Sequence, residues 1–218
     1  MTSNSIPQFI EIPANAMSLA MRRKVHGVGT NDARYATEVR NGSRSNRCPY
    51  YVKWASMLQR CYSEKYATKN PTYINCIVCD EWLTFSNFKK WMKKQDWAGK
   101  QLDKDLLVLS NKIYSPETCI FVSQHINDLL LDCGSRSGKY PQGVSYYKRD
   151  GSYEVKCRVE HSSRFLGRYP TICEAKLVYK KAKAKEIRRI AELQADSRLK
   201  KALHTHADTF RRLVKRRT

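Results

Sequence analysis

Two aspartates separated by one residue, Asp103 and Asp105, are the side chains of this sequence best suited to binding a hard cation. They fall in a segment, 100–106, whose pattern predicts a β-strand. Side chains two positions apart on a strand point to the same side of the sheet. Two carboxylates on one face match the oxygen ligands that Mg²⁺ or Mn²⁺ prefers in proteins. The segment therefore predicts a divalent-cation site.

A second pair of candidate metal ligands is Cys76 and Cys79, which have the CxxC spacing of a zinc knuckle. One hypothesis is a structural Zn²⁺ with tetrahedral thiolate ligands that stabilises a small domain. The remaining ligands would be two of Cys48, Cys61 and Cys119. The alternative is that Cys76 and Cys79 are small apolar residues packed beside Trp82.

The charge of the chain restricts its partners. There are 41 Lys and Arg against 20 Asp and Glu, a formal net charge of +21. Such an excess predicts a polyanionic partner, most often nucleic acid, with an anionic membrane surface as the weaker hypothesis. No apolar run approaches the ~18 residues of a membrane-spanning helix. The N-terminal sequence also lacks the pattern of a secretory signal, so we expect a cytoplasmic location and reduced thiols.

The elements that must position the aspartates are predicted within residues 49–131. Apolar residues recur at helical spacing after Pro49, which suits a first helical turn. The predicted elements are a helix from Pro49, a loop over 63–73, a helix over 86–94, strands over 100–106 and 119–122 with a loop closed by Ser115-Pro116 between them, and a helix over 123–131.

A second set of elements follows a Gly/Ser-rich linker. Alternation of apolar and polar residues from Tyr153 to Glu160 predicts a half-buried strand. Thr171 and Glu174 have the capping-box spacing that begins a helix, which we extend to 193. The predicted strands are 143–148, 153–160 and 164–168, joined by turns at 149–152 and 161–163.

Three stretches of this second set carry a recognisable pattern: Gly143-Val144-Ser145-Tyr146, Phe165-Leu166-Gly167-Arg168-Tyr169 and Thr171-Ile172-Cys173-Glu174-Ala175. Residues 139–192 thereby resemble the Apetala/ethylene-response-factor DNA-binding domain. The resemblance implies that the outer face of the sheet enters the major groove, where basic and aromatic side chains contact bases and phosphates. The residues implied are Tyr147, Lys148, Arg149, Lys156, Arg158, Arg164 and Arg168. The alternative is that Lys156 and Arg158 only solvate an open sheet face.

The stretch Leu102-Asp103-Lys104-Asp105, then Ser115 to Val122, then Asn127, has the order of a ββα-metal finger. It resembles the HNH (His-Me finger) endonucleases, particularly the homing-type enzymes of bacteriophages, several of which carry a C-terminal Apetala-type domain. The resemblance implies that Asp103, Asp105 and Asn127 hold one divalent ion, which offsets charge at the scissile phosphate. It also implies water activation by Asp103 and a phosphate contact by Lys104.

The sequence departs from that family at the general base, because Asp-Lys-Asp stands where a histidine is usual. Either Asp103 or Lys104 would replace the histidine. A carboxylate with a pKa of about 4 is a weak base at neutral pH unless burial raises the pKa. A lysine must first lose its proton, which requires strong desolvation.

We therefore predict an α+β fold: a small ββα-metal finger domain with flanking helices, linked to a three-stranded antiparallel sheet packed on one helix. The predicted function is metal-dependent hydrolysis of phosphodiester bonds in double-stranded DNA. A catalytically degenerate DNA-binding regulator or structural factor is the alternative, and an RNA-binding protein is a third hypothesis. The predicted parts are a basic extension (1–48), the finger domain (49–132), a linker (133–139), the DNA-binding domain (140–193) and a basic tail (194–218).

Overall fold

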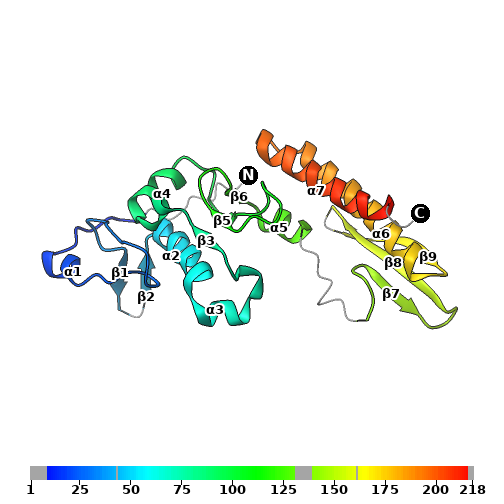
Figure 1. Cartoon of the computed structure of the whole chain (residues 1–218), viewed down its shortest axis with the longest axis horizontal. Coiled ribbons are helices and arrows are strands. Elements are labelled where there is room, and N and C mark those ends of the chain that lie inside the picture. The colour runs from blue at the N-terminus through cyan, green and yellow to red at the C-terminus, as the bar shows by residue number, and fades with distance from the viewer. Residues whose placement is uncertain (1–8, 43, 131–138, 161, 216–218) are drawn as a thin grey trace. The chain divides into compact units, whose positions relative to one another are not determined.

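The computed structural model describes residues 9–42, 44–130, 139–160 and 162–215. These residues form two compact units, an N-terminal unit that ends at Ser123 and a C-terminal unit that begins at Gln124 (Figure 1). The structure confirms the predicted α+β class and the three-stranded antiparallel sheet. Most of the predicted linker, and one residue of the second predicted turn, lie outside the described residues. None of the described helices combines the length and apolar character needed to cross a membrane.

The core of the N-terminal unit forms between α2 (Pro49–Tyr62) and α4 (Phe85–Met92), both of which were predicted. Proline at the first position of α2 costs no hydrogen bond, because that N–H would have no partner within the helix. Trp54 of α2 is fully buried, and its Nε1–H donates to the carbonyl oxygen of Trp82, 2.7 Å away, in a 3-10 helix at Asp80–Leu83. This bond supplies a polar partner to the largest side chain of the core.

The segment 63–73 was expected as a loop and is instead helical. It contains α3 (Glu64–Lys69) and a 3-10 helix at Pro71–Tyr73. The Ser63 hydroxyl accepts a hydrogen bond from the backbone N–H of Tyr66, which caps α3, and Glu64 lies in the first turn where a negative charge is favourable.

The N-terminal unit also contains four short strands. β3 (Ile77–Val78) pairs in parallel with β5 (Ile113–Tyr114), and β4 (Gln101–Asp103) pairs antiparallel with β6 (Ile120–Val122). Helix α5 (Gln124–Leu130) follows β6, so the predicted order of two strands and a helix is present along the chain. The predicted strand over 100–106, however, ends at Asp103.

The segment before α2 was expected to be a basic arm, but residues 9–48 belong to the N-terminal unit. They include α1 (Ala16–Ala20) and a hairpin of β1 (Glu38–Asn41) and β2 (Arg44–Arg47). Arg22 donates to the carbonyl oxygens of Asn31, Ala33 and Tyr35, and both Ala33 and Tyr35 are buried in the core. The sequence did not predict the order of this segment, because its apolar residues show only weak periodicity. Hydrogen bonds from Arg22 to backbone carbonyl oxygens hold the segment, and not the apolar face of an amphipathic helix.

The C-terminal unit is a sheet covered on one face by a helix. β7 (Val144–Tyr147), β8 (Ser152–Val159) and β9 (Ser162–Tyr169) pair antiparallel in the order 7-8-9, and α6 (Ile172–Glu192) packs against them (Figure 1). Thr171 caps α6 as predicted, since its Oγ1 accepts from the N–H of Glu174 at 3.2 Å. The core beneath α6 consists of Val144, Val155, Cys157, Ala175 and Tyr179.

The basic tail is also an ordered element. Helix α7 (Ser197–Lys215) lies alongside α6 (Figure 1), and its described part buries the apolar side chains of Leu199, Ala202, Leu203 and Ala207. Asp196 begins this helix, because its Oδ1 accepts from the N–H groups of Arg198 and Leu199. The run of lysines and arginines thus conceals an amphipathic helix with one apolar face.

The close approach of β7 to α6 predicts a steric requirement at Gly143. Its φ is +74°, and a Cβ there would overlap the Tyr179 ring and lie 2.6 Å from the Lys156 carbonyl oxygen. We expect Gly143→Ala to destabilise the C-terminal unit by roughly 2–4 kcal/mol, through overpacking and backbone strain together. Calorimetry, with tryptophan fluorescence to identify the transition of the N-terminal unit, would measure it, because all four tryptophans lie in that unit.

Gly151→Ala is the matched control. Gly151 has φ +70° in the β7–β8 turn, and the nearest atom to its added Cβ is the Tyr146 hydroxyl at 3.8 Å. This variant should lose only the ~1 kcal/mol cost of a left-handed alanine. Equal losses in the two variants would show that the packing of Gly143 against Tyr179 contributes nothing.

Candidate functional site

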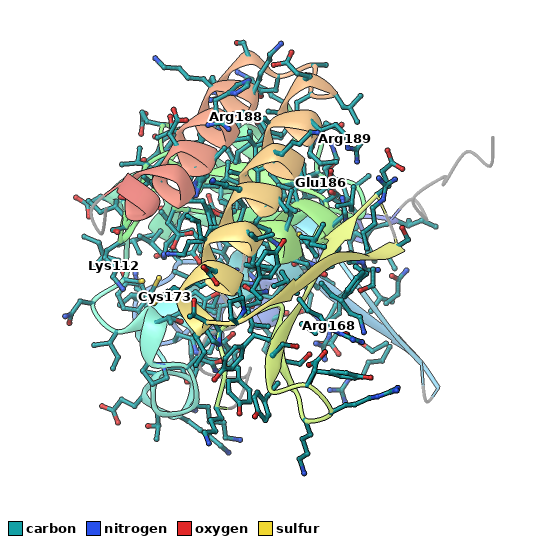
Figure 2. The ribbon with its side chains drawn as sticks, turned by 90° about the vertical axis from the view of Figure 1, so that its right-hand side faces the viewer. Lys112, Arg168, Cys173, Glu186, Arg188 and Arg189 are labelled. Atoms are coloured by element: carbon teal, nitrogen blue, oxygen red, sulfur yellow. The ribbon has the colours of Figure 1, made fainter. Side chains whose placement is uncertain are left out.

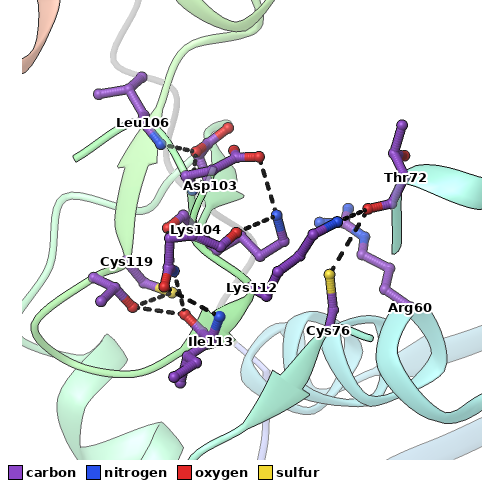
Figure 3. Close-up of polar contacts among 12 residues, drawn as sticks. Arg60, Thr72, Cys76, Asp103, Lys104, Leu106, Lys112, Ile113 and Cys119 are labelled. Atoms are coloured by element: carbon purple, nitrogen blue, oxygen red, sulfur yellow. Dashed lines mark hydrogen bonds and ion pairs between the residues drawn. The ribbon is translucent and has the colours of Figure 1, made fainter. Parts of the chain in front are cut away.

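The end of β4 is defined by the side chain of Asp103. Its Oδ1 accepts hydrogen bonds from the backbone N–H groups of Asp105 at 2.9 Å and Leu106 at 2.7 Å (Figure 3). An aspartate that bonds the backbone two and three residues onward forms a turn in place of a strand. The expectation that Asp103 and Asp105 share one strand face is therefore wrong, and it is the turn that brings the two carboxyl groups together.

The proximity of the two carboxyl groups changes the chemistry of Asp103. Burial, and then the negative charge of Asp105, raise the pKa of Asp103 to about 6. Each effect disfavours the ionised form, the first by loss of solvent and the second by like-charge repulsion. Burial thus supplies the condition that a carboxylate base near neutral pH requires.

Lys104 is directed into the protein. Only 6% of the residue is exposed, and its Nζ donates to Asp105 Oδ2 at 3.0 Å and to the Asn111 carbonyl oxygen at 3.1 Å (Figure 3). Burial disfavours the ammonium, but the hydrogen bond and charge of Asp105 outweigh it, so the pKa of Lys104 is raised. A lysine held in its charged form is a poor general base, so Asp103 is the better candidate of the two.

The loop between β4 and β5 is closed by side-chain hydrogen bonds. The Asn111 amide Nδ2 donates to the carbonyl oxygens of Lys104 at 2.7 Å and Ile113 at 2.6 Å. Thr118 Oγ1 also donates to the Ile113 carbonyl oxygen at 2.7 Å. These bonds tie the backbone at Lys104, between the two aspartates, to the start of β5.

The donor set for a divalent ion is present only in part within one unit. Asp103 and Asp105 supply hard oxygen ligands whose mutual repulsion a cation would relieve. Asn127, the third predicted ligand, lies on α5 in the C-terminal unit, and the two units are described separately. Within the described ranges, no three or more His, Cys, Asp or Glu side chains gather as a metal-binding group. The two aspartates fit a hard cation, and its full ligand set stays a prediction.

The cysteines of the N-terminal unit are distributed around β3. Cys76 precedes the strand and raises the pKa of the Cys61 thiol, second to burial, whereas Cys79 follows the strand and acts in the same way, more weakly, on Cys119. Cys48 hydrogen-bonds Tyr35 in the core instead. The pKa effects thus join Cys76 with Cys61 and Cys79 with Cys119, and the zinc site of Cys76 and Cys79 also stays a prediction.

The predicted DNA-contacting residues are best grouped on the outer face of the sheet, opposite α6. Strand register places Tyr147, Lys156, Arg158 and Arg168 there, because the alternate residues Val155 and Cys157 are buried toward α6. Lys148 and Arg149 lie exposed in the β7–β8 turn. We call Tyr147, Lys156, Arg158 and Arg168 the outer-face cluster.

Two contacts hold the centre of the outer-face cluster. The Arg168 guanidinium carbon lies 3.6 Å from the centroid of the Tyr147 ring, a cation–π contact that orients the guanidinium. Glu154 accepts from Lys156 Nζ at 2.6 Å and approaches Arg168 Nε at 3.5 Å. Figure 2 labels Arg168 on the sheet. Arg168 Nη1 also donates to Asp150 Oδ2 at 3.4 Å. Two carboxylates therefore position two cations, and the exposed Arg158 keeps the face net positive.

Arg164 differs from the other predicted contacts. It pairs in register with the buried Cys157, which places it at the margin of the sheet on the α6 side, where it forms an ion pair with Glu160 at 3.7 Å. A bulge in β9 near Leu166 and Gly167 causes this change of face, because it shifts the register between Val155 and Lys156.

Sequence reasoning missed Phe165 as an outer-face residue. It pairs in register with Lys156 and is 57% exposed. An exposed aromatic ring between cations is suited to stacking on or packing against a base. The bulge conceals it, because simple alternation along β9 from Arg168 puts Phe165 on the inner face.

Sequence reasoning also missed the buried contact that fixes the end of β8. Glu186 of α6 is 3% exposed, and its carboxylate accepts from the Glu160 N–H at 3.0 Å and from Arg189 at 2.8 Å (Figure 2). Glu160 has φ +53°, a strained conformation for a non-glycine residue. Glu186 therefore holds the strand end that carries Arg158, and no local pattern signals a bond across 26 residues.

No protein-family model matches the chain, and neither a search of curated proteins nor one of solved structures finds a similar protein. What the aspartate pair and the outer-face cluster do must therefore be argued from their side chains and from the resemblances in the sequence.

The raised pKa of Asp103 predicts that the ionised side chain lowers the stability of the N-terminal unit. Its pKa in the folded state lies above the ordinary value of 3.8, so ionisation destabilises the fold above pH 6 and has no effect below pH 4. Asp103→Asn keeps the acceptor for both N–H groups and removes the charge. We expect it to stabilise the N-terminal unit by roughly 1–2 kcal/mol at pH 8, a value reduced by solvent screening, and by almost nothing at pH 4.

Denaturant unfolding followed by tryptophan fluorescence measures this effect. Glu81→Gln, which removes an exposed carboxylate of the same unit, is the control and should show no such dependence on pH. If Asp103→Asn instead lowered stability at pH 8, the carboxylate would be a net stabilising group and the repulsion argument would fail.

Proposed function

We propose that this protein is a DNA-binding endonuclease of the HNH homing type, active with Mg²⁺ or Mn²⁺. The C-terminal unit binds duplex DNA through the outer-face cluster, and the finger around Asp103 hydrolyses a phosphodiester bond. The observation that carries the proposal is the convergence of Tyr147, Lys156, Arg158 and Arg168 on the sheet face opposite α6. The resemblances in the sequence and the net charge of +21 support the same partner.

Each member of the outer-face cluster has a distinct part in binding. Arg168 is held against Tyr147, so its planar fork is oriented before DNA arrives, which lowers the entropy lost on binding. Arg158 is exposed and forms no ion pair with the described residues, so its full charge can meet a phosphate or a guanine edge. Lys156 shares Glu154 with Arg168 and supplies a phosphate contact.

The finger supplies the proposed chemistry. A divalent ion at the aspartate pair would offset the negative charge on the scissile phosphate. The third ligand predicted from the sequence is Asn127. The two backbone hydrogen bonds fix the orientation of the Asp103 carboxylate. Where Asp103 activates water instead of binding the ion, its raised pKa makes it a stronger base than an ordinary aspartate. Lys104 is buried and paired with Asp105. It would therefore act by holding the Asp105 carboxylate, and not as the phosphate contact expected from the sequence.

One observation favours the second candidate, a DNA-binding protein whose finger has lost catalysis. The Lys104 ammonium already occupies Asp105 Oδ2 and thereby competes with a cation for this ligand. In that case the outer-face cluster keeps its role, and the finger serves as a scaffold in a regulator or structural factor.

The outer-face cluster predicts a specific loss of DNA affinity. Arg158→Ala should weaken duplex binding about 10-fold and lower the slope of log K against log salt by about 1, as expected for one phosphate contact. Lys181→Ala removes an exposed charge from α6, away from the sheet face, and should change affinity less than 2-fold. Fluorescence anisotropy over a salt series measures both variants.

Equal effects of the two variants would mean that binding follows net charge and not the sheet face. Tighter binding to structured RNA than to duplex DNA at equal salt would favour the RNA-binding hypothesis.

The same Asp103→Asn variant separates catalysis from folding. Because we expect it to be at least as stable as the wild type, loss of plasmid nicking in Mg²⁺ or Mn²⁺ could not be attributed to unfolding. We expect nicking to fall at least 100-fold, with duplex affinity unchanged and Glu81→Gln fully active. Asn127→Ala should also abolish nicking.

If the wild type fails to nick a plasmid that contains the bound site, while duplex affinity persists in chelator, the finger is degenerate and the second candidate function holds.

A further inference from the structure

A small pocket of about 120 Å³ lies between α2 and β4 in the N-terminal unit. Its polar lining consists of Lys53, Ser56 and Arg60 from α2 and Gln101 from β4, above an apolar floor of Met57 and Leu102. The pocket is small and lined mainly by polar side chains, so it suits a small polar group.

The three α2 side chains form one stripe. Residues three, four and seven positions apart lie on the same side of an α-helix, so Lys53, Ser56 and Arg60 all face β4. Lys53 Nζ donates to the Lys100 carbonyl oxygen at 2.7 Å, and Arg60 Nη1 approaches the Leu102 carbonyl oxygen at 3.4 Å. Arg60 also forms a side-chain hydrogen bond with Tyr114. These contacts anchor both cations, and each keeps N–H donors that they do not use.

The pocket has an unbalanced positive charge. Its described lining includes no aspartate or glutamate, and the pKa of Lys53 is lowered by burial and then by the charge of Arg60. The side chains of Ser56 and Gln101 form no hydrogen bond with another described residue, so both keep donors available. Two close cations and two available donors are the features of a site for an oxyanion.

We propose that this pocket binds one phosphate group of a nucleic-acid backbone, held by Lys53, Ser56, Arg60 and Gln101. Gln101 and Asp103 lie two residues apart on β4 and share a face, so their Cα atoms are about 7 Å apart. A strand anchored at the pocket would thus run beside the proposed hydrolytic carboxylate. The inference rests on the proposed function for the source of the phosphate, although free phosphate would meet the same donors.

Anion binding is tested first without DNA. Tryptophan fluorescence follows thermal unfolding of the N-terminal unit alone, in sodium phosphate or in sodium chloride of equal ionic strength. We expect phosphate to raise the wild-type midpoint by about 2–4 °C, because a ligand that binds only the folded state stabilises it. Lys53→Gln and Ser56→Ala should lose most of this rise.

Lys65→Gln is the matched control, since Lys65 is exposed on α3 and its loss changes the net charge of the unit equally. It should keep the full response to phosphate. Arg60 is left intact, because its contacts with the Leu102 carbonyl oxygen and the Tyr73 ring also support the fold.

Duplex binding then identifies the source of the phosphate. Lys53→Gln should weaken duplex affinity about 3–10-fold and reduce the salt slope by about 1, whereas Lys65→Gln should change affinity less than 2-fold. A response to phosphate that is lost in Lys53→Gln without any loss of duplex affinity would overturn the nucleic-acid source in favour of a free phosphate. No response to phosphate, together with equal duplex affinity of the two variants, would overturn the site. Failure of the proposed function would appear separately, as unchanged affinity in Arg158→Ala or as absent nicking.

Discussion

Twenty acidic side chains cannot neutralise 41 lysines and arginines, and this imbalance determines which partners the protein can bind. Several acids therefore serve two cations each. Glu154 holds Lys156 and Arg168 on the outer sheet face, and Glu160 contacts Arg164 and Arg189 at the sheet margin. Exposed pairs of this kind contribute little stability one by one. Their effect is to orient cations while leaving net positive charge, which is the arrangement that a polyanionic partner requires.

Acidic side chains inside the protein determine backbone geometry by accepting backbone hydrogen bonds. Asp103 ends β4 by accepting two backbone N–H groups, and Glu186 holds the strained end of β8. Buried charges are costly unless they are fully hydrogen-bonded. Glu186 meets this condition through Arg189, whereas Asp103 shares its surroundings with Asp105. Hydrogen bonding accounts for the buried Glu186 carboxylate, whereas the environment of Asp103 fits the hydrolytic role that we propose for it.

Much of the fold was predictable from local signals. The proline at the start of α2, the alternation along β8 and the Thr171 cap of α6 each act within a few residues, and each predicted its element. The structure differs from the prediction where a side-chain contact or a distant contact determines the local conformation. The examples are the turn at Asp103, the bulge that exchanges the sheet faces of Arg164 and Phe165, and the packing of residues 9–48. Composition likewise indicated charge in the tail but not the apolar stripe of α7. Candidate residues could therefore be named from the sequence, whereas their faces and partners could not.

The proposed function depends most on binding of duplex DNA to the sheet face opposite α6. Footprinting by lysine acetylation, read by mass spectrometry with and without a saturating duplex, tests it in the intact protein. We predict that DNA protects Lys156 on the outer face and Lys148 in the adjoining turn at least 5-fold, while Lys181 and Lys185, exposed on α6, keep their reactivity. Protection of the α6 lysines with continued modification of Lys156 would contradict the account, because DNA would then lie on the helical side of the unit.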